Sequence, residues 1–266
     1  MAEKNKHVFG TTEWAVANAN FLNGCRNDCK YCYSKDMAIR FKRKTASTWK
    51  DEVVNYPAFH KTIKRKDGYI MFPSTHDISV EHLDITIEYL KRLLSNDNSV
   101  LIVSKPVFQC IKIICDNFLD YKDKILFRFT IGSANSDTLR QWEPNAPDYE
   151  ERKQSLIYAF NLGYKTSISC EPMLDNKVDV VIDDLSRFVT DAIWLGKMNF
   201  LMRRLKTNGH SDPETIRAAE QLLTWQSDEE ILKLFQKYKD NPRIKWKESI
   251  KKVVGISIST KKGEDR

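Results

Sequence analysis

Short apolar runs alternate with helix-like stretches along the first three quarters of the chain. The runs are rich in β-branched and aromatic residues and cover residues 13–22, 69–73, 100–105, 125–132, 165–173 and 192–198. The helix-like stretches between them cover residues 34–43, 81–95, 107–119, 148–162 and 179–190. Buried strands that alternate with helices of this length predict βα units and a parallel sheet. We therefore expect an α/β protein built as a partial (β/α)6 barrel of the TIM type.

The pattern changes after the sixth run. Two helices are expected at about residues 212–223 and 228–239, followed by a basic tail. The tail contains the stretch VVGISIS at residues 253–259, which we expect to add a late strand. We therefore divide the chain into a barrel at residues 1–200 and a helical, basic C-terminal extension at residues 201–266 that packs on it.

Polar and sulfur-bearing side chains follow each predicted strand. In a barrel of βα units, the ligand site lies at the carboxyl ends of the strands. The residues at these positions are Cys25, Cys29 and Cys32; Ser74, Thr75, His76 and Asp77; Ser104 and Lys105; Ser133, Asn135 and Ser136; Cys170 and Glu171; and Lys197 and Asn199. We expect these side chains to converge on one pocket.

Three of the six cysteines, Cys25, Cys29 and Cys32, form a CxxxCxxC motif with no fourth cysteine or histidine beside it. Zinc in a structural site takes four ligands, so a fourth would have to come from a distant histidine or cysteine. An iron–sulfur cluster held by three thiolates instead leaves one iron open for a substrate or cofactor. Cys110 and Cys115 fall in an isoleucine-rich helical stretch and are expected to be core thiols.

The cysteine motif and two further stretches of the sequence resemble a known family. CxxxCxxC with an aromatic residue, Tyr31, before its last cysteine resembles the radical S-adenosylmethionine (SAM) superfamily. Within it, the chain is most similar to the spore photoproduct lyase-like branch and to phage-associated radical SAM proteins. This resemblance rests on GCRNDCKYCYSKDMAIRF at 24–41, IVSKP at 102–106 and WEPNAPDYEERKQSLIYAFNLGYKTSISCEPML at 142–174. It spans about residues 10–200.

The resemblance implies two cofactors, a [4Fe-4S] cluster ligated by Cys25, Cys29 and Cys32, and SAM bound at the open iron. In this superfamily an electron from the reduced cluster cleaves SAM to methionine and a 5′-deoxyadenosyl radical, which abstracts hydrogen from the substrate. A reductant such as flavodoxin or ferredoxin is implied as a partner. The protein's own task is to hold these groups in register and to exclude water and stray hydrogen donors.

The resemblance also implies contacts to SAM. The amino group of SAM would contact Ser74, Thr75 or Asp77, and its ribose and carboxylate would contact Ser104 and Lys105. Ser133 and Ser136 would contact the ribose hydroxyls, Arg152 would bind the carboxylate, and Glu171 would contact SAM or the substrate. The family's usual Gly-Gly-Glu is absent from the second-strand motif, which leaves open which of its three residues acts. Surface positions for the lysine and arginine, and ordinary loop capping for the serines of the fourth strand, are the competing interpretations.

Two further residues are candidates for a hydrogen donor or a radical relay. Cys170 ends the fifth predicted strand, and Tyr33 follows the cysteine motif directly. The donor cysteine of spore photoproduct lyases lies elsewhere in their chain, so the resemblance does not extend to lesion repair by the same mechanism.

A basic segment follows the cysteine motif. The chain has a formal net charge of +7, and residues 35–66 alone hold ten Lys and Arg against three Asp and Glu. Aromatic residues are interleaved with these charges, as in surfaces that track a phosphate backbone and stack bases. A solvated helix and loop would show the same composition. We expect the substrate to be a nucleic acid or nucleotide; the alternatives are radical chemistry on a peptide or small metabolite, and a non-enzymatic iron–sulfur or zinc protein that binds nucleic acid.

The sequence shows no secretion or membrane signal. The first thirty residues lack the pattern of a signal peptide, and no apolar run approaches the roughly 18 residues of a membrane span. We therefore expect a cytoplasmic protein without a membrane partner.

Overall fold

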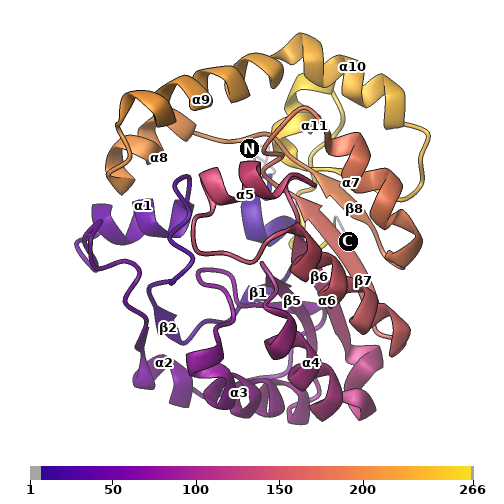
Figure 1. Cartoon of the computed structure of the whole chain (residues 1–266). Helices are drawn as coiled ribbons and strands as arrows, with labels where there is room; N and C mark the ends of the chain where they lie inside the picture. The colour runs from indigo at the N-terminus through magenta and orange to yellow at the C-terminus, as the bar shows by residue number, and fades with distance from the viewer. Residues whose placement is uncertain (1–6, 265–266) are drawn as a thin grey trace, which may run out of the picture.

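The computed structural model describes residues 7–264, and its main feature is a parallel sheet of seven strands (Figure 1). The strands follow one another across the sheet in chain order: β1 (Ala17–Asn18), β4 (Tyr69–Phe72), β5 (Ser99–Ser104), β6 (Ile125–Thr130), β7 (Lys165–Cys170), β8 (Ile193–Leu195) and β9 (Ile244–Trp246). Each of the six predicted runs contains a strand of this sheet. The predicted partial barrel of the TIM type is confirmed.

Helices connect the strands and cover the outer face of the sheet. The five predicted within the barrel are present as α1 (Tyr33–Arg40), α3 (Leu83–Ser95), α4 (Phe108–Asn117), α6 (Tyr149–Asn161) and α7 (Val178–Leu185). The two predicted in the C-terminal segment are α9 (Pro213–Trp225) and α10 (Asp228–Tyr238). Among residues 7–264, no helix has both the length and the apolar character to cross a membrane.

Several shorter elements have no counterpart in the prediction. They are the helices α2 (Tyr56–His60), α5 (Ser136–Trp142), α8 (Leu201–Asn208) and α11 (Glu248–Val254), the 3₁₀ turns η1 (Gly10–Glu13) and η3 (Leu119–Lys124), and the antiparallel pair β2 (Leu22–Asn23) and β3 (Val53–Val54). Most span two turns of helix or less, too short for a hydrophobic period to be recognised. The 3₁₀ turns η2 (Val80–His82) and η4 (Ser186–Phe188) overlap stretches predicted as helical.

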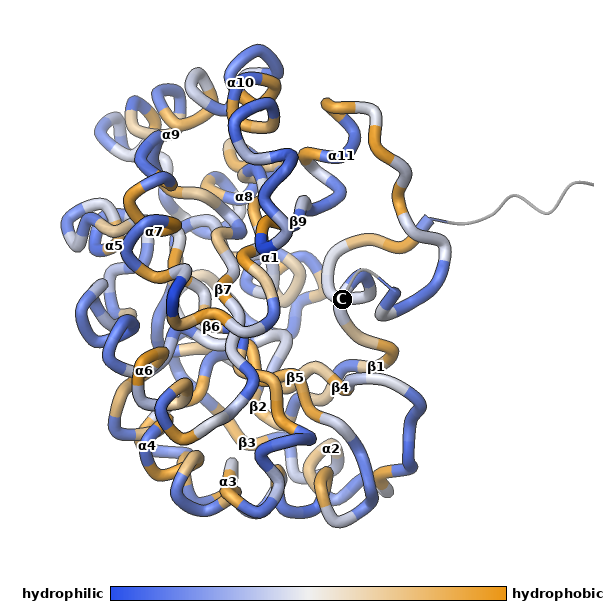
Figure 2. The backbone as a smooth tube through the Cα atoms, turned by 90° about the vertical axis from the view of Figure 1, so that its right-hand side faces the viewer, coloured by the Kyte–Doolittle hydropathy of each residue, from blue (hydrophilic) through white to orange (hydrophobic). Residues whose placement is uncertain are grey.

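The two faces of the sheet bury different side chains. The outer face packs Phe72, Ile102, Phe127 and Ile168 against the helices in the main core. Figure 2, in which the chain is coloured by the hydropathy of each residue, shows that β5 and β6 consist mainly of hydrophobic residues. The inner face is closed by a smaller cluster in which the guanidinium of Arg128 lies 4.7 Å from the ring centre of Trp14 and 5.2 Å from that of Trp194. Because side chains alternate along a strand, each residue of β6 or β7 belongs to one of these two environments.

The late strand lies elsewhere than expected. VVGISIS does not form a strand: Val253 and Val254 end α11, and Gly255 follows with a φ of 74°. A left-handed glycine directly after the last turn is a common way to end a helix. The added strand is β9, whose Ile244 and Trp246 are buried beside β8. The segment beyond residue 200 therefore contributes to the sheet as well as packing on it, and the division at that residue stays a prediction.

Candidate functional site

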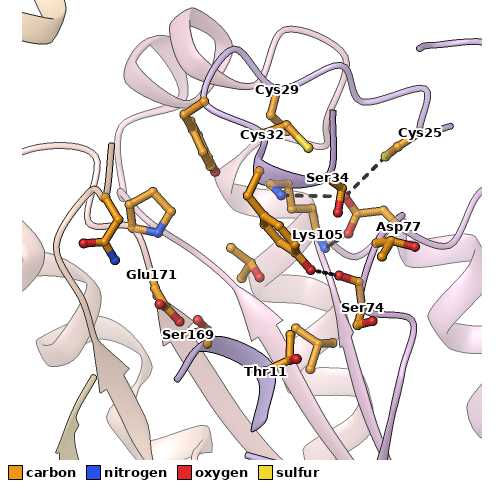
Figure 3. A pocket seen from close by; sticks show the side chains of 18 of the residues that line it. Thr11, Cys25, Cys29, Cys32, Ser34, Ser74, Asp77, Lys105, Ser169 and Glu171 are labelled. Carbon is orange, nitrogen blue, oxygen red and sulfur yellow. Dashed lines mark hydrogen bonds and ion pairs between the residues drawn. The ribbon is translucent and has the colours of Figure 1, made fainter. Parts of the chain in front are cut away.

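A cavity of about 450 Å³ opens at the carboxyl ends of the strands (Figure 3). Its volume lies within the roughly 300–1,000 Å³ usual for small-molecule sites. Twelve of the predicted site residues line it: Cys25, Cys29, Cys32, Tyr33, Ser74, Thr75, His76, Asp77, Lys105, Glu171, Lys197 and Asn199. The parallel sheet brings them together because its strands end at one edge.

The three cysteines lie on a loop that leads from β2 into α1. Gly24 allows the loop to pass close to residues 49 and 51: at this residue φ is 108°, and an added Cβ would lie 2.6 Å from the carbonyl oxygen of Asp51. At the other end, the sulfur of Cys32 caps α1 by accepting a hydrogen bond from the Lys35 amide at 3.4 Å. The loop is thus fixed at both ends, with all three thiols around one cavity.

The donor set fits a cluster with three protein ligands. Burial raises the pKa of all three thiols, so each is protonated at neutral pH until a metal displaces the proton. Within residues 7–264, no three His, Cys, Asp or Glu side chains converge where a single metal ion would bind. A cluster of several irons takes each thiolate at a different iron, so its ligands surround a volume rather than a point. Cys25, Cys29 and Cys32 would be these ligands.

Asp77 is the most highly connected polar residue of the pocket. Its Oδ1 accepts hydrogen bonds from Ser104 Oγ at 3.0 Å and from the Lys105 amide at 2.7 Å, and its Oδ2 accepts one from Asn27 Nδ2 at 2.9 Å. Lys105 Nζ lies 3.6 Å from the same Oδ2. Burial opposes ionisation of Asp77, but Lys105 and these hydrogen bonds outweigh it and lower the pKa of the carboxyl. Asp77 is therefore an oriented carboxylate at the cavity wall.

The Ser74–Thr75 backbone is held by a residue that the sequence did not indicate. Asn20 Oδ1 accepts hydrogen bonds from the amides of Ser74 at 2.7 Å and Thr75 at 3.0 Å, and Asn20 Nδ2 donates to Ser74 Oγ at 2.8 Å. Across the cavity, the hydroxyl of Tyr33 donates to the Ser74 carbonyl. Burial raises the pKa of Tyr33 to about 12, so this phenol stays neutral.

Glu143 organises the wall behind the cysteines. Its side chain is fully buried and receives Arg152 Nη2 at 2.6 Å, the Tyr31 hydroxyl, and Lys105 Nζ at 3.9 Å. The predicted role of Arg152 is not supported, because its guanidinium also donates to the carbonyls of Pro147 and Thr130 and does not line the cavity. Arg152 supports the wall from behind. Glu143 belongs to the stretch at 142–174 on which the family resemblance rests, but the sequence analysis assigned it no role.

The other predicted site residues lie outside the cavity lining. Ser104 is behind Asp77, Ser133 donates to Asp175, and Ser136 starts α5 and accepts from the Tyr149 amide at 3.4 Å. Cys170 is fully buried in the outer core, while its neighbours Ser169 and Glu171 line the cavity. The alternation of side chains along β7 turns the thiol toward the helices, so Cys170 is not in position to meet a substrate.

A charged cluster forms the floor of the cavity. Lys247, fully buried, lies with its Nζ 2.7 Å from Glu13 Oε1 and 3.4 Å from Glu171 Oε2. Glu248, next in the chain, lines the cavity, and its amide donates to Glu13 Oε2 at 3.2 Å. Burial raises the pKa of Glu171, and it raises the pKa of Glu13 to about 7 despite the opposing charge of Lys247. Lys247 and Glu248 follow β9, where the sequence offered no motif.

The basic segment is divided between the two ends of the barrel. Lys35 is not exposed as expected: it is buried with its Nζ 2.7 Å from Asp28. Arg43 is exposed and lines a smaller pocket that shares Trp49 with the main cavity. Lys66 precedes β4, and its amide donates to Oδ1 of Asn98, directly before β5, at the opposite end of the strands from the cavity. Only the first half of the basic segment therefore lies on the cavity side of the barrel.

Comparison with known proteins agrees with this architecture. No family model matches the chain. An uncharacterized protein, ORF301, of Acidianus two-tailed virus is 25% identical over 197 residues, covering 69% of this chain and 64% of that protein. Spore photoproduct lyase with dinucleoside spore photoproduct matches at a TM-score of 0.53 and 15% identity, covering 80% of this chain and 65% of the lyase.

A second structure of spore photoproduct lyase, with bound AdoMet and the dinucleoside, gives a TM-score of 0.54 at 15% identity, over 79% of this chain and 65% of that one. This chain thus spans slightly less than two thirds of the length of the proteins it matches. The likeness extends over most of the barrel. The chain has the fold of spore photoproduct lyase.

Proposed function

We propose that the protein is a radical SAM enzyme that acts on a nucleic acid or nucleotide. Cys25, Cys29 and Cys32 would hold a [4Fe-4S] cluster, SAM would bind beside it in the cavity, and a one-electron reductant such as flavodoxin or ferredoxin would be the electron donor. When bound, these groups supply a 5′-deoxyadenosyl radical that abstracts hydrogen from the substrate. The division into a barrel at residues 1–200 and an extension at 201–266, and a cytoplasmic location, belong to this proposal.

One observation carries the proposal. The three cysteines line the same cavity as an oriented carboxylate, Asp77, and a partly buried ammonium, Lys105, in the fold of spore photoproduct lyase. SAM carries an amino group and a carboxylate, which need an acceptor and a cation respectively. Asp77 and the Ser74–Thr75 segment offer acceptors, and Lys105 offers the cation.

The remaining residues of the cavity position these groups and keep water out. Burial opposes the charge of Lys105, but the negative charges of Asp77 and its other neighbours raise its pKa, so it stays an ammonium. Asn20 orients the Ser74–Thr75 segment. A closed, rigid cavity is what a reactive radical requires, because any loose hydrogen donor would quench it.

The substrate class rests on charge around the cavity mouth. Arg40, Lys42 and Arg43 are exposed at and after the end of α1, on the cavity side of the barrel. Arg203 and Arg204 lie across from them on α8, which packs beside α1 (Figure 1). A cationic rim around an enclosed site favours a polyanionic substrate. The matched spore photoproduct lyase structures hold a dinucleoside.

Anaerobic reconstitution tests the proposal. We expect about four irons and four sulfides for each chain if one cubane cluster binds, and 5′-deoxyadenosine on addition of dithionite and SAM. Single-stranded DNA or RNA should increase its yield. Cys25→Ala should lose the iron, while Cys110→Ala, which removes a buried thiol of α4 outside the cavity, should keep it.

The outcomes separate the alternatives. Zinc without iron, and no 5′-deoxyadenosine, would mean a non-enzymatic metal protein. SAM cleavage that no nucleic acid or nucleotide stimulates, but that a short peptide or a metabolite does, would keep the chemistry and replace the substrate class.

A further inference from the structure

An aromatic side chain is held exposed at the mouth of the cavity. Phe200 is 66% exposed, lines the cavity and precedes the first residue of α8. Its backbone has a φ of 55° and a ψ of 32°, in the left-handed region that bulky residues rarely adopt. Strain of this kind persists where a site requires it, and here it accompanies an aromatic face left open to solvent.

Two arginines stand in the first turn of the same helix. Arg203 and Arg204 place their guanidinium carbons 4.7 Å and 5.9 Å from the ring centre of Phe200. Positive charge is unfavourable near a helix N-terminus, where the backbone dipole is itself positive, and this turn contains no acidic residue. The local arrangement therefore disfavours these cations unless an anion joins them.

The two arginines differ in their partners. Arg203 Nη2 lies 3.2 Å from Asp36 Oδ2, which also lies 3.7 Å from Arg40. Arg204 lines the cavity and, within residues 7–264, makes no ion pair, and its buried Nε makes no hydrogen bond. The carboxylates whose charges act on Arg204 are those of Asp36 and Glu171, and neither forms an ion pair with it. Arg204 is a partly buried cation whose anion is not supplied by the described chain.

Other cations of the rim do not share this condition. Lys197 lines the cavity, but its Nζ lies 2.9 Å from Asp228. Lys105 lies deeper and is paired with Asp77. Phe200 and Arg204 therefore place a planar ring and a guanidinium without an ion-pair partner side by side at the cavity mouth, where one ligand could contact both. A nucleotide has the complementary pair of features: a base to stack and a phosphate to accept from arginine.

We propose that Phe200 and Arg204 form a nucleotide-binding site at the cavity mouth, in which Phe200 stacks on a base of the substrate and Arg204 binds the adjoining phosphate. This inference rests on the proposed nucleic-acid substrate and names the residues that would select it. Phe200 and Arg204 lie at α8, whereas the cysteines and Asp77 line other parts of the same cavity, so the substrate would lie beside the position of SAM. Phe200 remains a substrate-binding residue with no part in cluster formation.

The test uses cluster-loaded protein and fluorescein-labelled single-stranded oligothymidylate, followed by fluorescence anisotropy under anaerobic conditions. Phe200→Leu removes the aromatic face but keeps an apolar side chain, and should weaken binding about tenfold, as expected for the loss of one stacked base. Arg204→Gln should lower the slope of log K against log salt by about 0.7, the value for one phosphate contact to a single strand. Thymidine and thymidylate as competitors then separate base from phosphate binding.

Arg187→Gln is the matched control. It removes an arginine whose guanidinium carbon lies 4.7 Å from the ring centre of Phe188, outside the cavity lining. It should leave binding unchanged. Phe200→Leu should weaken thymidine and thymidylate alike, and Arg204→Gln should weaken thymidylate more than thymidine.

The failures are distinguishable. Wild-type protein that binds oligothymidylate, with both variants equal to it, overturns this site and leaves the proposed function standing. Wild-type protein that binds no oligonucleotide removes the nucleic-acid substrate itself. If Arg204→Gln instead weakens SAM binding in calorimetry and spares oligothymidylate, the arginine binds the cofactor carboxylate and the inference is wrong.

Discussion

Glu143 shows how one buried carboxylate supports several parts of the site. It receives the guanidinium of Arg152, the phenol of Tyr31 and, more distantly, the ammonium of Lys105. Arg152 and Glu143 are both fully buried, and neither touches the cavity. Removing one partner of such a pair leaves an uncompensated buried charge.

Glu143→Gln should therefore destabilise the protein by about 3–5 kcal/mol, the range for breaking a buried ion pair. Urea unfolding under anaerobic conditions, followed by tryptophan fluorescence, measures the change. Glu229→Gln is the control, because Glu229 pairs with Lys233 at 2.8 Å on the surface and its loss should change stability little. Equal changes in the free energy of unfolding for the two substitutions would mean that the buried pair of Glu143 and Arg152 does not stabilise the protein more than a surface pair does.

Glu13 gives stability a defined dependence on pH. Its pKa is raised from 4.5 to about 7 by burial, with Lys247, Glu171 and Glu248 as the charged neighbours. A carboxyl whose pKa is raised on folding binds its proton more tightly in the native state, so stability falls as pH rises through this interval. The full effect is about 3 kcal/mol, at about 1.4 kcal/mol for each pH unit.

Glu13→Gln should make the unfolding free energy flatter between about pH 4.5 and 7. Glu81→Gln, on an exposed glutamate, should keep the wild-type slope, since that side chain is 54% exposed. The prediction fails if Glu13→Gln and wild type show the same slope. Taking the difference between the two proteins removes the contributions of groups common to both, such as buried His76.

At the scale of elements, α8 fixes the cysteine loop from outside the barrel. Asn208, the last residue of α8, donates from Nδ2 to the carbonyls of Lys30 at 2.9 Å and Cys32 at 3.0 Å. Lys30 Nζ in turn donates to Thr215 Oγ1 on α9 at 2.9 Å. The segment beyond residue 200 thereby acts on the geometry of the loop that carries the three cysteines.

Asn208→Ala should loosen this loop by removing two buried hydrogen bonds, with a stability loss of about 1–3 kcal/mol. Cluster loss in air, followed by its visible absorbance, should become faster. Asn117→Ala is the control, because Asn117 donates a single exposed hydrogen bond to the Ile113 carbonyl at 2.8 Å. An unchanged rate of cluster loss in Asn208→Ala would show that the loop is rigid without α8.

The elements that could be predicted from the sequence are those with a long enough pattern. The strands from β4 to β8 and helices such as α3 have continuous apolar runs or repeated helical spacing, so their places were correct. β9 has three residues, and its burial depends on β8 beside it. α8 was missed because it carries arginines in its first turn and directly follows a strained residue, Phe200. Both elements are determined by tertiary contacts that the local sequence does not encode.

The same limit applies to the site. The cysteines, Asp77 and Lys105 could be predicted because they follow strands at one edge of the sheet, a rule that needs no distances. The face of the strand on which Cys170 lies depends on the exact register of β7, because a shift of one residue turns each side chain to the other face. Asn20, Asn208 and Lys247 act through contacts between segments far apart in sequence, and no motif marks them.

At the scale of the whole molecule, the parallel barrel decides which basic residues a substrate meets. Residues that follow a strand face the cavity, and residues that precede one lie at the other end. Arg40, Lys42 and Arg43 belong to the first group, whereas residues 61–66 precede β4 and belong to the second. The composition of the basic segment at residues 35–66 does not separate these two groups. The fold does, and it gives the two halves of the segment different expected roles.

The division can be tested with two triple variants of equal charge change. Arg40→Gln, Lys42→Gln and Arg43→Gln together should weaken oligothymidylate binding and lower its salt slope by about 2, since each phosphate contact to a single strand contributes about 0.7. Lys61→Gln, Lys64→Gln and Lys66→Gln together should leave both unchanged, because these exposed side chains lie at the far end of the strands. Equal losses would mean that net charge alone attracts the strand, whereas a loss confined to the first variant means that the strand lies across the cavity mouth, between α1 and α8.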